Sequence, residues 1–135
     1  MNEPEKIEEI LRTARTIAVV GCSPNPARPS HSIAQFLIDS GYEVIPVNPG
    51  HREILGRRCY PSLLEIPAGI SIDIVDIFRR SSAVAALVEP ALSRKVRFFW
   101  MQEGVVDREA ARILEEAGVG VAMDRCILKE HRKHL

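Results

Sequence analysis

Residues 16–41 read TIAVVGCSPNPARPSHSIAQFLIDSG, and this stretch decides the fold. Its first five residues are mostly β-branched and carry apolar side chains on both alternating faces, which is typical of a strand covered on both sides. Gly21 ends that run, and a polar, proline-rich loop leads to Ser30, a residue type that favours the N-cap of a helix. Residues 33–37 then show helical apolar spacing, and Gly41 is a typical helix stop. The stretch therefore predicts a strand, a loop and a helix in that order.

The rest of the chain repeats this alternation of apolar runs and amphipathic segments. Four further runs predict strands: EVIPVN (43–48), IDIVDIF (72–78), VRFFWM (96–101) and VGVAMD (119–124). Apolar stripes at helical spacing predict helices that start near Pro4, at Ser81 or Ser82, and at Asp107, and a short basic helix ends the chain. Pro90 predicts that the helix after Ser81 or Ser82 is kinked or shortened, because proline removes a backbone donor.

Five strands that alternate with helices, without a linker or repeat, predict a single α/β domain over residues 1–135. We expect a Rossmann-like domain whose five-stranded, mainly parallel sheet has the order 3-2-1-4-5 and helices on both faces. Pro46 cannot donate to the ladder and favours a less central place for the second strand. This order predicts a ligand crevice beyond the carboxyl ends of strands 1 and 4, where the winding reverses. Function is therefore expected in the loops that follow Gly21, Asn48, Phe78 and Met101.

Composition and charge exclude several classes of protein. The 135 residues are 46% apolar, enough for a buried core, and 18 Lys+Arg balance 18 Asp+Glu. This balance leaves no global field that would attract nucleic acid or a membrane surface, so an acidic ligand has to be held locally. The three cysteines form no CxxC pair, which argues against a disulfide scaffold and a structural metal site. No signal peptide or membrane-spanning run is visible, and we expect a cytoplasmic protein.

The loop after the first strand favours a phosphate ligand over an ordinary dinucleotide site. Unpaired N–H groups and the positive dipole end at a helix N-terminus attract anions, and Arg28 adds a guanidinium suited to phosphate oxygens. The dinucleotide fingerprint G-x-G-x-x-G needs three glycines, of which only Gly21 is present. The carboxylate that holds a ribose is also missing, because the second strand ends in Val47 and Asn48. The structural alternative is that Ser30 only caps the helix and Arg28 is solvated.

Six motifs along nearly the whole chain resemble the small single-domain CoA-binding protein family. In chain order they are VVGCSPNPARPSHSIAQFL, GYEVIPVNPG, EILGRRCYPSLLEI, IDIVDIFRR, FFWMQEGV and MDRC. That family is related to the CoA-binding domain of the succinyl-CoA synthetase α subunit and has a Rossmann-like fold. The resemblance implies a binding site for coenzyme A, or for an acyl-CoA, as the small-molecule partner.

The resemblance also implies which residues contact CoA. The family's phosphate loop falls on Gly21, Cys22, Ser23, Arg28, Pro29, Ser30 and His31, and its PVNP segment on Pro46, Val47, Asn48 and Pro49. Phe78 and Arg79 form its FR pair, and the wall along the pantetheine arm corresponds to Trp100, Met101, Gln102 and Gly104. Gly50 stands where family members often have a lysine, so a cation for the 3′-phosphate has to come from His51 or Arg52.

Chemical matching of side chains to the parts of CoA agrees with several of these positions. Arg28 suits the pyrophosphate, Val47 and Phe78 can flank the adenine, and Gln102 can pair with a pantetheine amide. For the monophosphate the candidates are Arg52, Arg57 and Arg58. For Trp100 and Met101 the alternative is a buried strand end, since large apolar residues are usually interior.

No catalytic constellation is evident. Ser30 and His31 are neighbours on a helix and point about 100° apart, so they form no dyad. Cys126 follows the last strand at the ligand edge, where a mixed disulfide with the CoA thiol is conceivable; the alternative is an inert thiol. We therefore expect a CoA-binding module without evident catalysis of its own. A nicotinamide-dependent oxidoreductase, an acyl-CoA-handling enzyme and a protein-interaction domain with a vestigial crevice are the alternatives.

Overall fold

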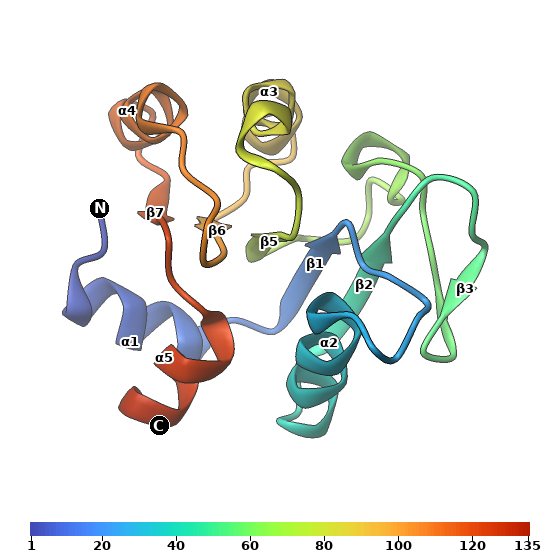
Figure 1. Ribbon diagram of the computed structural model, residues 1–135. Helices are drawn as coiled ribbons and strands as arrows, with labels where there is room; N and C mark the ends of the chain where they lie inside the picture. Colours follow the sequence, from blue (N-terminus) through green and yellow to red (C-terminus); the bar gives the residue numbers. More distant parts are fainter.

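The computed structural model describes residues 1–135 and contains a five-stranded sheet in which every strand pairing is parallel (Figure 1). From one edge to the other the strands are β2 (Glu43–Val47), β1 (Thr16–Val20), β5 (Ile74–Ile77), β6 (Phe98–Met101) and β7 (Gly120–Ala122). Every residue of β5 and β6 is buried, because helices cover both faces of the sheet. The predicted α/β class with a five-stranded parallel sheet is confirmed.

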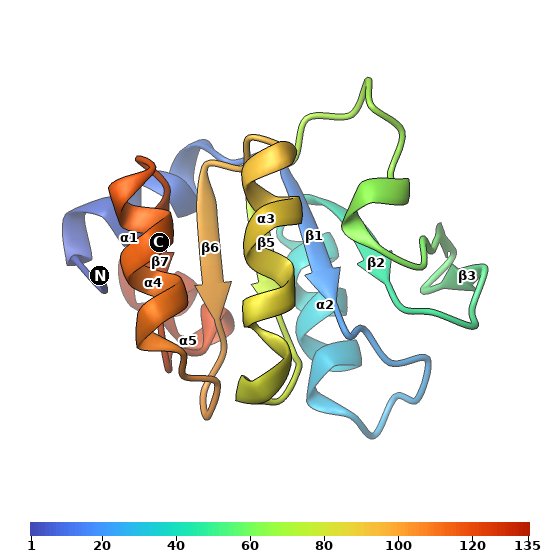
Figure 2. The same cartoon turned by 90° about the horizontal axis from the view of Figure 1, so that it is seen from above.

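The helices form one layer on each face of the sheet (Figures 1 and 2). One layer contains α1 (Pro4–Thr13), α2 (Pro29–Asp39) and α5 (Ile127–His134), and the other contains α3 (Ala85–Ser93) and α4 (Arg108–Glu116). Successive strand residues point to opposite faces and so divide between two apolar cores. Val19 and Trp100 pack with the first layer, whereas Val20 and Met101 pack with the second. No helix is both long and apolar enough to cross a membrane.

The sequence-based prediction of the strand order is wrong in one respect. We expected 3-2-1-4-5, but the third strand, β5, lies between β1 and β6, so the order is 2-1-3-4-5. Ile74–Ile77 are completely buried, and only a central position gives such a strand neighbours on both edges and cover on both faces. The winding therefore reverses between β1 and β5, and the crevice predicted beyond strands 1 and 4 is expected between these two instead.

The second strand lies at the edge, as Pro46 favours. The Pro46 carbonyl accepts a hydrogen bond from the Tyr60 N–H at 3.1 Å, and the Asn48 N–H donates to the Tyr60 carbonyl at 2.9 Å, both on the outer side of β2. Because the N–H and C=O of one residue in a parallel strand share a side, the N–H that Pro46 lacks would face away from β1. The proline therefore removes no bond from the sheet.

The connection from β2 to β5 contains no α-helix. It forms a small hairpin of β3 (Glu53–Ile54) and β4 (Arg57–Arg58), then a 3-10 turn over Leu63–Glu65. Residues 63–70 of this connection are held by the Arg94 guanidinium, which lies at the end of α3. It donates to four carbonyls at 2.6–3.0 Å, those of Leu63, Ile66, Pro67 and Ile70. This connection therefore depends on one side chain for much of its hydrogen bonding.

The helix starts only partly follow the predicted caps. Asp107 caps α4, since its carboxylate accepts from the Ala110 N–H at 3.0 Å. Ser30 is not a cap, because α2 already begins at Pro29, a residue whose fixed φ suits the first helical position. The helix after Ser81 and Ser82 begins at Ala85 with no side-chain cap and runs through Pro90. Ser81 Oγ instead accepts from the Val106 N–H at 2.9 Å and so joins the loops after β5 and β6.

Candidate ligand-binding site

A cleft of about 610 Å³ opens at the carboxyl edge of the sheet. Its walls come from the loops after β1, β5 and β6 and from the residue before α5, because a parallel sheet gathers these segments at one edge. The lining residues are Gly21, Ser23, Arg28, Pro29, Ser30, Ile33, Phe78, Arg79, Gln102, Glu103, Gly104, Val105 and Cys126. Most of them are site residues that the sequence predicts.

The loops after β1 and β5 meet at Gly21. This residue has a φ of +85°, and a Cβ added to it would lie 2.5 Å from the Phe78 carbonyl oxygen. Both the backbone conformation and the neighbouring carbonyl therefore exclude an L side chain. The Phe78 N–H also donates to the Val20 carbonyl at 2.8 Å, which continues the ladder up to this contact. Gly21 thus determines how closely the two loops approach each other.

The loop from β1 to α2 is shaped by its own polar side chains. Ser30 Oγ accepts from the Ser23 N–H, Ser23 Oγ accepts from the Asn25 N–H, and Asn25 Oδ1 accepts from the Ala27 N–H, each at 3.0 Å. The loop ends at the N-terminus of α2, where Pro29 has no N–H, the His31 N–H donates to the Arg28 carbonyl at 3.0 Å, and the Ser30 N–H has no acceptor in the chain. An anion in the cleft would meet the Ser30 N–H and the positive end of the helix dipole.

The charged side chains around the cleft leave it positive. Arg28 and Arg79 line it from two different loops, are both exposed, and form no ion pair. Glu103 is the one carboxylate in the lining, and it pairs with the Lys129 ammonium at 3.0 Å. The arginines are therefore available to an anionic ligand.

A second hollow, of about 730 Å³, lies beyond the end of β2. Its lining includes His51, Arg52, Arg58 and one carboxylate, Glu65, and the Arg58 guanidinium lies 5.4 Å from the centre of the Tyr60 ring. Neither Arg52 nor Arg58 has a carboxylate partner. Asn48 links this hollow to the loop after β1: its Nδ2 donates to the Cys22 carbonyl at 2.7 Å and its carbonyl accepts from the Cys59 thiol at 3.5 Å.

Gln102 joins the cleft to the start of α5. Its side chain is only 5% exposed, and Oε1 accepts from the Ile127 N–H at 3.0 Å. The residue lines the cleft, and its Nε2, which is not fully buried, donates to no group of the chain. Cys126, the N-cap of α5, is a free cysteine that lines the cleft beside this contact.

The other predicted site residues lie outside both hollows: Cys22, His31, Pro46, Val47, Asn48, Pro49, Arg57, Trp100 and Met101. Trp100 and Met101 are completely buried in opposite cores, and Trp100 Nε1 donates to the Arg125 carbonyl at 2.9 Å. The side chains of Trp100 and Met101 are therefore buried at the end of β6, as the alternative prediction for these two residues had it. Burial, and then the charges of Cys59 and Asp76, raise the pKa of the Cys22 thiol to about 12, so this thiol stays protonated at neutral pH.

Asp76 is a polar residue to which the sequence pattern assigns no role. It lies in β5 opposite Val19 and Trp100, is completely buried, and neither carboxylate oxygen has a hydrogen-bond partner. Burial raises its pKa well above the ordinary value for an aspartate, because a buried site without hydrogen-bond donors favours the protonated carboxyl. The signal that could have drawn attention to it is a charged residue inside an otherwise apolar central strand.

The sequence match to a known family covers the elements that build both hollows. Residues 15–132 match a family described as a CoA binding domain. The chain belongs to the CoA-binding domain family. The resemblance that the six motifs carry is therefore confirmed, and this CoA-binding domain can be compared with relatives of two sizes.

Small relatives match the domain over nearly their whole length, and larger ones over a fraction. YneT of Bacillus subtilis is 44% identical over 133 residues, which cover 97% of each chain. A hypothetical protein from Pyrococcus horikoshii OT3 has 39% sequence identity and a TM-score of 0.91, covering 97% of this chain and 91% of that one. Acetate–CoA ligase (ADP-forming) I of Archaeoglobus fulgidus is 28% identical over 129 residues, which are 88% of this chain but only 18% of the ligase.

Proposed function

We propose that this CoA-binding domain holds CoA or an acyl-CoA at the carboxyl edge of its sheet and has no catalysis of its own. The observation that carries the proposal is the set of unpaired cations at this edge: Arg28 and Arg79 in the cleft, and Arg52 and Arg58 in the second hollow. CoA carries a pyrophosphate and a separate 3′-phosphate, so two positive regions match its two anionic regions.

Each part of the ligand has a suitable neighbour. The pyrophosphate fits between Arg28 and the N-terminus of α2, with Arg79 on the facing loop. The 3′-phosphate suits the second hollow, where Arg52 and Arg58 are available, and the adenine suits the partly buried Phe78. The pantetheine arm can run along Gln102 and Gly104, because Gln102 offers an amide donor to an amide carbonyl.

The absence of catalysis is inferred from how the candidate nucleophiles are engaged. Ser30 Oγ lies 3.0 Å from the Ser23 N–H as an acceptor, and no histidine lines the cleft. Cys22 is buried and protonated. No nucleophile and base therefore face each other in the cleft. The three free cysteines also support the reducing cytoplasm as the location.

Calorimetric titration with CoA, dephospho-CoA and NAD tests the proposal. We expect saturable CoA binding and weaker binding of dephospho-CoA, by roughly tenfold or more, because one charge-assisted phosphate contact contributes about 1.5–3 kcal/mol. NAD should not bind, since β2 ends without the carboxylate that would hold its ribose. The variant Arg52→Ala/Arg58→Ala should bind CoA and dephospho-CoA equally.

Two results would count against this assignment. If the folded, ligand-free protein shows no saturable binding of CoA, the proposed function is wrong. If the unaltered protein binds CoA and dephospho-CoA with equal affinity, the second hollow does not hold the 3′-phosphate.

A further inference from the structure

Asn48 lies between the cleft and the second hollow and lines neither of them. It directly follows β2, is half-buried, and its Nδ2 donates to the Cys22 carbonyl at 2.7 Å. This is the only hydrogen bond that joins residues 22–28, in the loop after β1, to residues 48–61, which contribute most of the lining of the second hollow. One side-chain amide is therefore the polar link between the two proposed anion sites.

On the side of the second hollow, the backbone of Asn48 anchors the segment that carries the cations. Its N–H donates to the Tyr60 carbonyl at 2.9 Å, and its carbonyl accepts from the Cys59 thiol at 3.5 Å. The Cys59 N–H in turn donates to the Arg52 carbonyl at 2.8 Å. The Arg58 guanidinium lies 5.4 Å from the centre of the Tyr60 ring. The backbone of Arg52 and the side chain of Arg58 are thus both placed by residues that Asn48 contacts.

On the side of the cleft, the Asn48 amide holds a peptide group on which the rest of the loop depends. The Cys22 carbonyl belongs to the same peptide as the Ser23 N–H, which donates to a serine hydroxyl in the first turn of α2 at 3.0 Å. Ser23 Oγ then accepts from the Asn25 N–H, and the Arg28 N–H donates to the Asn25 carbonyl, each at 3.0 Å. The place of Arg28 therefore depends on a peptide that is held at its oxygen by Asn48.

We infer that Asn48 is a positioning residue that holds the two hollows at the separation at which one CoA molecule fills both. The inference rests on the proposed function, which assigns the pyrophosphate to the cleft and the 3′-phosphate to the second hollow. Because the two phosphate groups belong to one molecule, both gain their contacts only when the hollows are held at a matching separation. Asn48 therefore determines how strongly the 3′-phosphate contributes to binding, without itself contacting the ligand.

Calorimetric titration of Asn48→Ala with CoA and dephospho-CoA tests this inference. The substitution removes Nδ2 and keeps the backbone N–H and carbonyl that contact Tyr60 and Cys59. We expect the ratio of the dissociation constants for dephospho-CoA and CoA to fall by roughly threefold or more, because the two hollows are no longer held together. The loss of affinity should fall mainly on CoA.

Two further variants separate positioning from a general disturbance of the loop. Asn25→Ala is the matched control, because Asn25 Oδ1 accepts from the Ala27 N–H within the same loop and reaches no residue of the second hollow. It should weaken CoA and dephospho-CoA by the same factor and leave the ratio unchanged. When Asn48→Ala is added to Arg52→Ala/Arg58→Ala, the affinity for CoA should fall by less than about twofold further, because the contacts that Asn48 positions are already absent.

Hydrogen exchange in the unaltered protein gives a second test that needs no variant. Dephospho-CoA lacks the 3′-phosphate, so it orders the second hollow only through Asn48. At saturation it should slow exchange of the Cys59 and Tyr60 amides, which donate to the Arg52 and Pro46 carbonyls. Unchanged exchange at both amides would contradict the positioning role, and this measurement decides if Asn48→Ala does not fold.

The outcomes distinguish this inference from the proposed function. An unchanged ratio in folded Asn48→Ala, or an equal fall of the ratio in Asn25→Ala, would overturn the positioning role and leave CoA binding intact. Equal affinity of the unaltered protein for CoA and dephospho-CoA would remove the 3′-phosphate from the second hollow and would overturn this inference with it. Failure of CoA to bind the unaltered protein would overturn the proposed function itself.

Discussion

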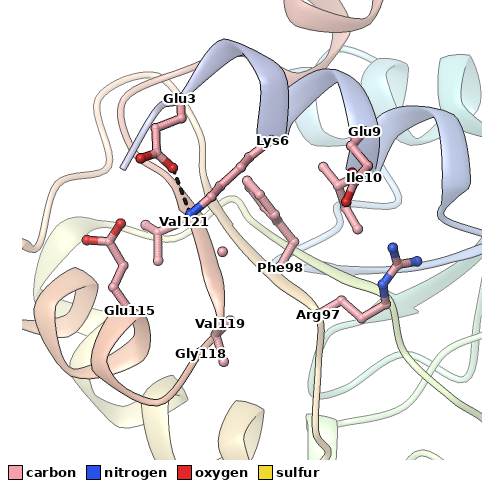
Figure 3. A pocket seen from close by; sticks show the side chains of 11 residues that line it. Glu3, Lys6, Glu9, Ile10, Arg97, Phe98, Glu115, Gly118, Val119 and Val121 are labelled. Atoms are coloured by element: carbon pink, nitrogen blue, oxygen red, sulfur yellow. Dashed lines mark ion pairs between the residues drawn. The ribbon is translucent and has the colours of Figure 1, made fainter.

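Both ends of the sheet carry charged side chains, but the two ends differ in how these charges are paired. At the amino end, a hollow of about 410 Å³ between α1, α4 and β7 is lined by Glu3, Lys6, Glu9, Arg97 and Glu115 (Figure 3). Lys6 pairs with Glu3 at 2.9 Å, Arg97 with Asp73 at 3.5 Å, and Glu115 with the N-terminal ammonium at 2.6 Å. At the carboxyl end, Arg28, Arg79, Arg52 and Arg58 have no carboxylate partner.

This difference shows that charge alone does not identify the ligand site. The chain has no net charge, and both ends of the sheet contain arginines. In the hollow at the amino end both cations, Lys6 and Arg97, are paired within the chain, so an anion there would have to displace a carboxylate. At the carboxyl end the four guanidinium groups have no carboxylate partner, and Arg28 is the N-cap residue of α2, so an anion gains contacts there without breaking an ion pair. The state of pairing therefore separates the hollow at the amino end from the candidate site at the carboxyl end.

The largest expected effect is the loss of stability when Arg94 is replaced at the amino end. Arg94→Ala removes hydrogen bonds to four carbonyls and leaves them without a charged donor, so we expect the free energy of unfolding to fall by about 3 kcal/mol. The matched control Arg97→Ala breaks an exposed pair and should cost less than about 1 kcal/mol. Urea denaturation measures both. Equal small losses would show that Arg94 is not structural, and loss of CoA affinity in a folded variant would break the contrast between the ends.

At the carboxyl end, Arg28→Ala should affect binding and leave stability nearly unchanged. Arg28 is exposed and unpaired, so its removal should change the free energy of unfolding by less than about 0.5 kcal/mol. We expect CoA affinity to fall by about 2 kcal/mol, roughly thirtyfold, through loss of a charge-assisted contact. Calorimetry measures this, with Arg12→Ala as a control for an exposed arginine that pairs with Glu8 far from the cleft. Unchanged affinity in Arg28→Ala would remove this arginine from the site.

The smallest expected effect is a gain in stability at Asp76, near the carboxyl end of β5. Its pKa is raised in the folded protein by burial, whereas in the unfolded chain it ionises near pH 4. Its stabilising contribution is therefore complete below about pH 4 and is lost as pH rises toward the folded pKa. Asp76→Asn should be more stable at pH 7 by on the order of 1 kcal/mol, with a difference that shrinks toward pH 4. Urea denaturation across this range measures it, and a parallel pH dependence in both proteins would contradict the buried neutral carboxyl.

Local patterns made most of the secondary structure and part of the site predictable. The β-branched run at 16–20, the Asp107 cap and the helix stop at Gly41 all depend on neighbours in sequence, and the structure contains the corresponding elements. The polarity of a parallel sheet then places the loops after β1, β5 and β6 at one edge, so Gly21, Arg28 and Phe78 meet as predicted. Sequence periodicity did not predict that Trp100 and Met101 would be buried below the cleft, because an apolar residue at a strand end can face either a core or a ligand.

The amino-acid sequence by itself determined the alternation of strands and helices, the glycine at which two loops meet, and the arginine next to a helix start. Only the tertiary structure decided that β5 lies between β1 and β6, that Gln102 accepts a hydrogen bond from the Ile127 N–H at the start of α5, and which arginines are paired. The physical reason is the separation along the chain over which each interaction acts. Hydrophobic periodicity and caps act over a few residues, whereas strand neighbours and ion pairs join residues that are far apart in the chain, such as Arg97 with Asp73.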